Sequence, residues 1–192
     1  MPERDVKSTT VDVPEKSGTN PTLLLMAGLP GTGKTTLALA LGRRLGWPVI
    51  DKDSLKSPLL TTGISNELAG PASYALLLEI ANDLLVRQRL SIILDSPARY
   101  RSVLEHALSL THQAGACLKI IHCVANQELR QKRIRNRVAR PSQWTTNADL
   151  SDEEVQQMFE HLPANILTLD TSHPFEQCIA EALAYLTDFV SL

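Results

Sequence analysis

The sequence predicts a layered α/β fold built around a parallel sheet of about five strands. Short apolar runs that do not alternate with polar residues recur along the 192-residue chain, as expected of strands covered on both faces. Between these runs, apolar residues fall at helical spacing. Because parallel strands must be joined by crossover connections, the alternation of strands and helices favours a single domain of right-handed α/β units.

Five apolar runs are the predicted strands: residues 23–27, 48–51, 91–95, 118–124 and 166–170. Helical spacing is clearest in three segments between them. These segments carry Leu37, Ala40, Leu41 and Leu45, then Tyr74, Leu77, Leu78, Ala81 and Leu85, then Val103, Leu104, Ala107 and Leu108. Pro97 and Pro174 are expected in first helical turns and Gly115 at a helix end, while residues 151–154, SDEE, form a capping box.

Composition limits the possible partners and compartment. The chain is 43% hydrophobic and 21% charged with a net charge of -2, which gives no overall attraction to nucleic acid or to an anionic membrane. Three scattered cysteines indicate neither a disulfide framework nor a zinc site. The first twenty residues are charged and contain prolines, unlike a signal peptide. We therefore expect a cytoplasmic protein with no membrane segment, consisting of a flexible tail, residues 1–20, and one domain, residues 21–192.

The strongest motif follows the first predicted strand. Residues 28–35 read GLPGTGKT, which satisfies G-x-x-x-x-G-K-[ST] and precedes a helical pattern. Such a loop curls backbone amides around phosphate and aims a helix N-terminus at it. The alternative, a glycine-rich turn with a solvated lysine, does not explain both the spacing and the flanking elements. The predicted nucleotide-binding residues are Gly28, Leu29, Pro30, Gly31, Thr32, Gly33, Lys34, Thr35 and Thr36.

Acidic residues follow the second and third predicted strands. Asp51 and Asp53 end the second, where one of them can accept the proton of an attacking hydroxyl; alternatively, Asp53 simply caps the next helix. Asp95 ends the third, and together with the Thr35 hydroxyl it is a candidate Mg²⁺ ligand. Ser96, where many ATPases have a glutamate, favours phosphoryl transfer over hydrolysis.

With these runs in place, the chain resembles the P-loop kinases of the polynucleotide 5'-kinase, zeta-toxin and chloramphenicol phosphotransferase type. The resemblance rests on GLPGTGKTT, VIDKDSLK, ILDSPARYR, LRQKRIRNRVAR and ILTLDTSHPFEQ, and covers about residue 22 to the C-terminal helix. It implies strand order 2-3-1-4-5, ATP and Mg²⁺ as cosubstrates, and helices on both faces of the sheet with a helical lid, about residues 130–150.

The resemblance also implies residue roles. Asp53 matches the general base, with Asp51 as a substitute, and Lys56 matches an arginine that grips an acceptor phosphate in polynucleotide kinases. Lysine lacks the bidentate fork of arginine, which argues against a nucleic-acid acceptor. Thr171 and Ser172 are candidate contacts to adenine, and Trp144 receives no role.

The lid sequence carries an arginine pattern. If residues 130–140 are helical, Arg130, Arg133, Arg137 and Arg140 share one face, where arriving phosphate would relieve their repulsion. Arg133 and Arg137 are therefore predicted catalytic residues alongside Lys34 and Asp53. The alternative is a solvated helix face.

The predicted function is an ATP-dependent kinase that moves the γ-phosphoryl group to a hydroxyl of a small molecule or nucleotide. The acceptor pocket is expected mainly from residues 57–73 and the lid. A polynucleotide 5'-hydroxyl kinase is one alternative, which the 4% aromatic content disfavours. A non-kinase ATP-binding module or weak ATPase is the other.

Overall fold

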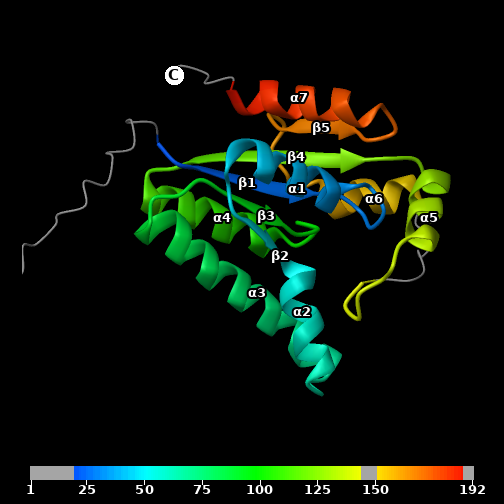
Figure 1. The fold of residues 1–192 in the computed structure, drawn as a ribbon, viewed down its shortest axis with the longest axis horizontal. Helices are drawn as coiled ribbons and strands as arrows, with labels where there is room; N and C mark the ends of the chain where they lie inside the picture. The colour runs from blue at the N-terminus through cyan, green and yellow to red at the C-terminus, as the bar shows by residue number, and fades with distance from the viewer. Residues whose placement is uncertain (1–19, 144–150, 188–192) are drawn as a thin grey trace, which may run out of the picture.

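Five parallel strands form one sheet at the centre of the computed structural model, which describes residues 20–143 and 151–187 (Figure 1). The strands are β1 (Thr22–Ala27), β2 (Val49–Asp51), β3 (Ile92–Asp95), β4 (Cys117–Val124) and β5 (Leu167–Asp170). Their order is β2-β3-β1-β4-β5, and every pairing is parallel. The predicted fold class and strand order are therefore confirmed, and each predicted strand lies within one residue of the observed one.

Helices cover both faces of the sheet. One face carries α1 (Lys34–Leu45) and α7 (Phe175–Thr187); the other carries α3 (Asn66–Asn82), a π-helical turn (Asp83–Arg87), α4 (Arg101–Ala114) and α6 (Asp152–Phe159). All six residues of β1 are buried, and the five apolar ones, residues 23–27, alternate between the two hydrophobic clusters that these helices complete. The central strand is thus fixed from both sides, which gives a rigid base to the loop that follows it.

Most of the predicted helix signals are observed. Ser151 and Glu154 form the capping box, and Gly115 ends α4 in the left-handed conformation. The placement of Pro97 in a first helical turn was wrong, because α4 begins only at Arg101 and Pro97 lies in the preceding loop. Its carbonyl accepts a hydrogen bond from the Gly28 amide at 3.2 Å, so that loop is attached to the segment after β1.

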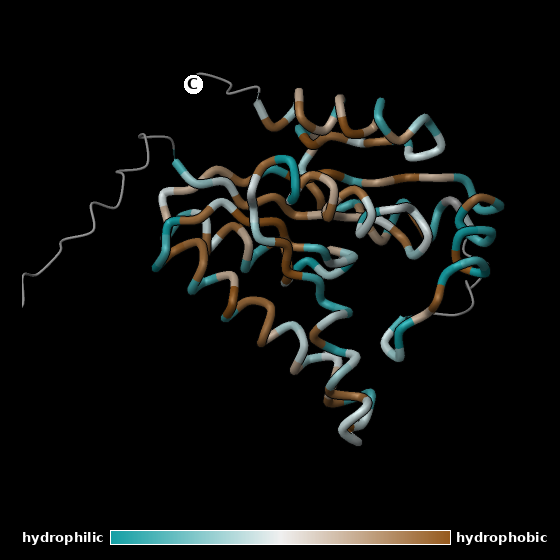
Figure 2. Tube along the Cα trace, viewed as in Figure 1, coloured by the Kyte–Doolittle hydropathy of each residue, from teal (hydrophilic) through white to brown (hydrophobic). Residues whose placement is uncertain are grey.

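Two helices lie at the carboxyl end of the sheet. α2 (Lys52–Thr61) follows β2 without a loop, and α5 (Gln127–Asn136) follows β4 (Figure 1). In Figure 2, α5 is mostly hydrophilic, whereas the central strands are mostly hydrophobic. No helix in the described ranges has the length and apolar composition needed to cross a membrane.

The predicted four-arginine stripe does not form. α5 ends at Asn136, and Arg137 has extended backbone angles (φ −90°, ψ 150°). Arg140 precedes Pro141, and a proline disfavours helical geometry in the residue before it. Of the four arginines in the predicted stripe, Arg130 and Arg133 are helical, whereas Arg137 and Arg140 belong to residues 137–143, here called the lid segment. Residues 1–19 and 144–150, which include most of the predicted tail, Trp144 and the rest of the predicted lid, lie outside the described residues.

Candidate active site

The phosphate loop, residues 28–35, has a backbone that only glycine permits at key positions. Gly28, Gly31 and Gly33 have φ of +130°, +82° and +84°. A Cβ on Gly28 would lie 2.3 Å from the Cys123 carbonyl oxygen, and one on Gly31 would lie 2.6 Å from the Arg130 carbonyl oxygen. α1 begins directly after Gly33, so its first amides and its positive dipole end face the loop. This is the geometry expected of a phosphate cradle.

Lys34 is the first residue of α1, is half-buried, and lines the cavity beside the loop. Its Nζ donates a hydrogen bond to the Leu29 carbonyl at 2.9 Å. Burial lowers the pKa of Lys34, while the nearby carboxylate of Asp95 opposes that change. The loop therefore holds a cation beside a carboxylate at the mouth of the sheet.

Asp95 is only 3% exposed at the end of β3, in register with Met26 of β1 and Asp51 of β2. Burial raises the pKa of Asp95 to about 6, although Lys34 and a hydrogen bond from Thr35 oppose the rise. Within the described residues its Oδ2 is buried without a hydrogen-bond partner. A hydroxyl and a carboxylate side by side, with one carboxylate oxygen unsatisfied, fit a Mg²⁺ ion.

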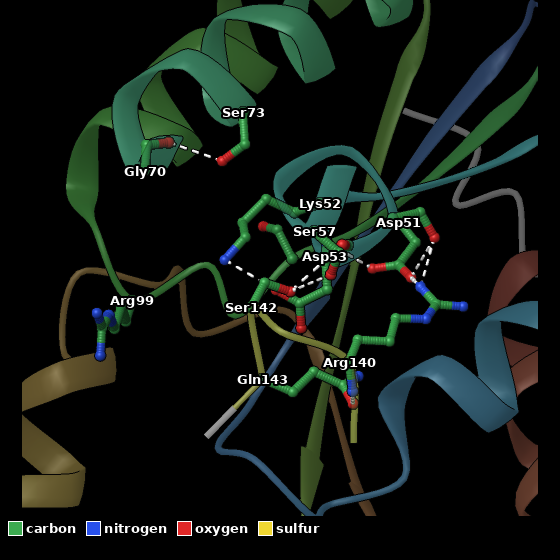
Figure 3. Close-up of polar contacts among 12 residues, drawn as sticks. Asp51, Lys52, Asp53, Ser57, Gly70, Ser73, Arg99, Arg140, Ser142 and Gln143 are labelled. Carbon is green, nitrogen blue, oxygen red and sulfur yellow. Dashed lines mark hydrogen bonds and ion pairs between the residues drawn. The ribbon is translucent and has the colours of Figure 1, made fainter. Parts of the chain in front are cut away.

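Asp51 and Asp53 have different surroundings. Asp51 is the N-cap of α2: its carboxylate accepts hydrogen bonds from the Asp53 amide at 2.9 Å and the Ser54 hydroxyl at 2.8 Å. It also pairs with Arg140 at 2.5 Å (Figure 3). The alternative in which Asp53 caps this helix is therefore wrong, since Asp51 does so.

Asp53 makes a single ion pair among the described residues, with Lys52 at 3.0 Å (Figure 3). Its side chain is 28% exposed and lines the same cavity as the phosphate loop. Of the two aspartates, Asp53 is the one whose carboxylate makes fewer hydrogen bonds.

Arg133 fastens α5 to the phosphate loop. Its guanidinium donates to the Gly31 carbonyl at 3.4 Å and to the Thr171 hydroxyl and carbonyl at 2.9 and 2.7 Å. The Thr171 hydroxyl in turn donates to the Thr32 carbonyl at 2.7 Å. Thr171 thus lies against the loop, whereas the amide of Ser172 donates to the Asp170 carboxylate. These bonds tie the ends of three elements together around the cradle.

The lid segment closes onto α2. Besides the pair between Arg140 and Asp51, the hydroxyls of Ser142 and Ser57 lie 2.9 Å apart, and that of Ser142 donates to the Asp53 carbonyl at 3.3 Å. Arg137 lines the cavity and is close enough to affect the titration of Lys34. The first turn of α2 is thereby covered from the side of α5.

One cavity of about 850 Å³ joins the phosphate loop to α2. Sequence reasoning missed several residues on its α2 side, namely Lys52, Tyr74, Arg99, Tyr100 and Gln143. The signals for Lys52 and Arg99 were present, because Lys52 stands between the two aspartates and Arg99 follows Asp95 by four positions. The expected contribution of residues 57–73 was largely wrong: of that segment only Gly70 lines the cavity, because α2 runs outward from the sheet (Figure 1).

Comparisons with known proteins agree with this architecture. A family model described as an AAA domain (AAA_33) matches residues 23–171. The replication factor C large subunit of Methanocella arvoryzae is 39% identical over 61 residues, which are 32% of this chain. The chain spans only 11% of the length of that curated relative.

Solved structures with a similar fold include several kinases. A proposed kinase from Chloroflexus aurantiacus J-10-fl has a TM-score of 0.66 at 24% identity, covering 87% of this chain and 99% of its own. A gluconokinase from Sinorhizobium meliloti 1021 has a TM-score of 0.55 at 21% identity, with 87% and 92% covered. The APS kinase of Mycobacterium tuberculosis, solved with AMPPNP and APS, has a TM-score of 0.56 at 17% identity, with 87% and 98% covered. The fold is that of P-loop kinases.

Proposed function

The chain belongs to the AAA_33 family of AAA domains, and from that premise we propose that it is an ATP-dependent kinase with a hydroxyl group as acceptor. The acceptor is a small molecule or a nucleotide. Mg²⁺ is the proposed metal cosubstrate. The observation that carries the proposal is the position of Asp53, which lies across one cavity from the phosphate loop, with Asp95 at the strand end between them.

Phosphoryl transfer depends mainly on positioning and on stabilisation of charge. The amides of the phosphate loop and Lys34 are proposed to hold the triphosphate. Thr35 and Asp95 would hold Mg²⁺, which when bound supplies positive charge to the phosphate oxygens. Lys34 then stabilises the negative charge on the transferred group.

Asp53 is the proposed general base. It accepts the proton of the acceptor hydroxyl while the hydroxyl oxygen bonds to the γ-phosphorus and the bond from that phosphorus to ADP breaks. The ion pair with Lys52 orients the carboxylate. A base that is already oriented loses less conformational entropy on reaching the transition state than a mobile one. The cap bonds of Asp51 and its pair with Arg140 occupy its carboxylate, which supports Asp53 over Asp51 as the proposed base.

Hydrolysis has weaker support at this site. Ser96 follows Asp95, is buried, and accepts a hydrogen bond from the Ala98 amide at 3.3 Å. A neutral hydroxyl that already makes a hydrogen bond cannot serve as a general base toward water as a glutamate carboxylate would. Transfer to an acceptor hydroxyl therefore suits the residues better than ATP hydrolysis.

The two predicted lid arginines receive different roles. Arg137 lines the cavity and is proposed to add positive charge around the transferred group. Arg133 donates hydrogen bonds to Gly31 and Thr171 and is proposed to order the phosphate loop. A direct contact of Arg133 with phosphate remains a prediction.

The proposal is tested by transfer of labelled γ-phosphate into a fractionated panel of metabolites and oligonucleotides. Asp53→Asn is expected to lower kcat about 10²- to 10⁴-fold, the usual contribution of a general base, with ATP affinity nearly intact. Asp51→Asn is the matched control: asparagine is as good an N-cap as aspartate, so the loss should be smaller.

Three outcomes would contradict the proposal. Loss of both transfer and ATP binding in Asp53→Asn would remove Asp53 from the catalytic role. ATP turnover that no acceptor changes would favour a weak ATPase or nucleotide-binding module. Phosphorylation of oligonucleotide ends alone would favour a polynucleotide kinase.

A further inference from the structure

Lys52 and Asp53 form an ion pair that their positions in α2 do not favour. They are consecutive residues of the first helical turn, so their side chains leave the helix about 100° apart. Their charged atoms are nevertheless 3.0 Å apart (Figure 3). The Lys52 side chain, which is only 13% exposed, therefore turns back across the helix to reach the carboxylate. A long, flexible side chain keeps such a conformation best when a contact outside its own helix stabilises it.

A tyrosine of α3 provides that contact. Lys52 Nζ lies 5.7 Å from the centroid of the Tyr74 ring, within the range of a cation–π interaction. The ring is itself fixed, because it packs against the hydrophobic cluster between α3 and the sheet and meets Tyr100 edge to face with centroids 6.1 Å apart. Burial raises the pKa of Tyr74 to about 12, so the ring remains a neutral phenol. The Lys52 ammonium group thus contacts both the proposed base and a ring of a second helix.

A second ammonium group competes for the same carboxylate. Lys56 lies one turn further along α2 and lines the same cavity as Asp53. Burial lowers the pKa of Lys56, and the charge of Lys52 lowers it further, while Asp53 opposes the change. The two lysines therefore repel each other beside one carboxylate. The Tyr74 ring stabilises the ammonium group of Lys52 and so favours the pairing of Lys52 with Asp53.

We propose that Tyr74 is a positioning residue of the kinase reaction: its ring holds Lys52 against Asp53, and Lys52 in turn orients the carboxylate that accepts the acceptor proton. The inference rests on the proposed function. Tyr74 acts through Lys52 and needs no contact with either substrate. Through this contact α3, a helix remote from the phosphate loop in sequence, sets the geometry of the proposed base.

A double-mutant cycle tests whether Tyr74 acts through Lys52. Transfer is measured with the best acceptor among glycerol, D-gluconate, adenosine and AMP. Tyr74→Leu, which removes the ring, should lower kcat about tenfold, while the KM for ATP changes less than about twofold. Tyr74→Phe keeps an aromatic face and should retain at least about half of the wild-type kcat. Lys52→Met should lower kcat by at least as much as Tyr74→Leu, and adding Tyr74→Leu to it should cause no further loss.

The chain contains a matched control for this contact. Lys119 Nζ lies 4.6 Å from the centroid of the Tyr185 ring, and both residues lie outside the cavity. Tyr185→Leu removes the same type of contact and should leave kcat within about twofold of the wild type when both proteins are assayed below their Tm. Equal losses of kcat in Tyr74→Leu and Tyr185→Leu would mean that lost packing is the cause, and the inference would be wrong.

A second measurement does not require transfer. Acetylation by sulfo-N-hydroxysuccinimide acetate, followed by mass spectrometry, reports how accessible each lysine ammonium group is. Lys52 should be acetylated about threefold faster in Tyr74→Leu than in the wild type, and at nearly the wild-type rate in Tyr74→Phe. Lys132 of α5, which is exposed, is the internal reference.

The outcomes separate the two hypotheses. A loss of kcat from Tyr74→Leu that persists in the Lys52→Met background, or unchanged acetylation of Lys52, overturns the positioning role and leaves the kinase proposal standing. Faster acetylation in Tyr74→Leu, without transfer to any acceptor by the wild type, supports the contact between Tyr74 and Lys52 and overturns the kinase proposal. If Tyr74→Leu raises only the KM for the acceptor, the ring binds the acceptor directly, and the inference is wrong.

Discussion

A single buried carboxylate, Asp95, connects stability to the proposed function. Burial raises its pKa to about 6, from its usual 3.8. The folded state therefore holds this proton more tightly than the unfolded state, and the stability of the metal-free protein falls as pH rises from about 4 to about 6. The difference of about 2 pH units corresponds to about 3 kcal/mol.

Asp95→Asn should consequently stabilise the metal-free protein. At pH 7.5 we expect its free energy of unfolding to exceed that of the wild type by about 1–3 kcal/mol, because a neutral amide avoids the cost of a buried charge. At pH 4 the two should be nearly equal. Urea titrations at both pH values measure this, and the extra stability from Mg²⁺ with ATP should be lost in the variant. A variant less stable than the wild type at pH 7.5 would contradict the account.

Gly28 is the residue where the backbone of the phosphate loop is most constrained. In Gly28→Ala the new Cβ would meet the Cys123 carbonyl 2.3 Å away, at a φ of +130° that alanine rarely adopts. We expect a loss of about 2–3 kcal/mol or more in unfolding free energy, together with loss of ATP binding. Gly63→Ala is the control, since its φ is +89° but no atom lies within 4 Å of the new Cβ. Equal effects of the two substitutions on urea unfolding would show that steric contact is not the cause.

The site residues predictable from the sequence were those fixed by local motif geometry. Glycines, Lys34 and Asp95 sit at set positions relative to a strand end, so their spacing identifies them. The choice between Asp51 and Asp53 was not predictable, because it depends on the residue at which β2 becomes α2. Tyr100 depends on the turn at Ala98, whose φ of +51° no sequence rule anticipates.

At the scale of the element, the lid segment is held by polar contacts. Arg140 pairs with Asp51, but its side chain is 47% exposed, so this pair contributes little to overall stability. Its effect is local, because it holds the lid segment against the first turn of α2. These contacts also account for the absence of the helical stripe predicted for residues 130–140. Beyond Asn136 the chain makes contacts to α2 in place of further helical turns.

Arg140→Gln should therefore loosen the lid segment without unfolding the domain. We expect the free energy of unfolding to change by less than about 1 kcal/mol, while amide hydrogen exchange in residues 137–143 becomes faster. Mass spectrometry of peptic fragments measures the exchange. Arg135→Gln, at an exposed position outside the cavity, is the control and should leave exchange unchanged. Identical protection in the two variants would mean that Arg140 does not hold the segment.

Across the whole molecule, the sheet was predictable because buried parallel strands leave continuous apolar runs in the sequence. β1 illustrates this: each of its residues is buried, and the run is unmistakable. The cavity was less predictable, since α2, α3, the β3–α4 loop and the lid segment all contribute to it. Their directions depend on tertiary packing, which sequence periodicity does not encode. The expected cytoplasmic location remains a prediction.

Charge distribution over the whole molecule argues against a polynucleotide acceptor. The net charge is -2, and Lys52, Lys56 and Arg99 lie within one cavity. Single-stranded nucleic acid is usually bound along a basic groove with stacking aromatic residues. We therefore expect fluorescence anisotropy in 150 mM salt to detect no binding of a single-stranded 20-nucleotide DNA or RNA at protein concentrations up to about 10 μM. This concentration is well above the dissociation constants of specific nucleic-acid complexes. Binding that weakens steeply with salt, with a logarithmic slope beyond about −2, would show that several phosphates are contacted. That result would make a polynucleotide 5'-hydroxyl the better proposal for the acceptor.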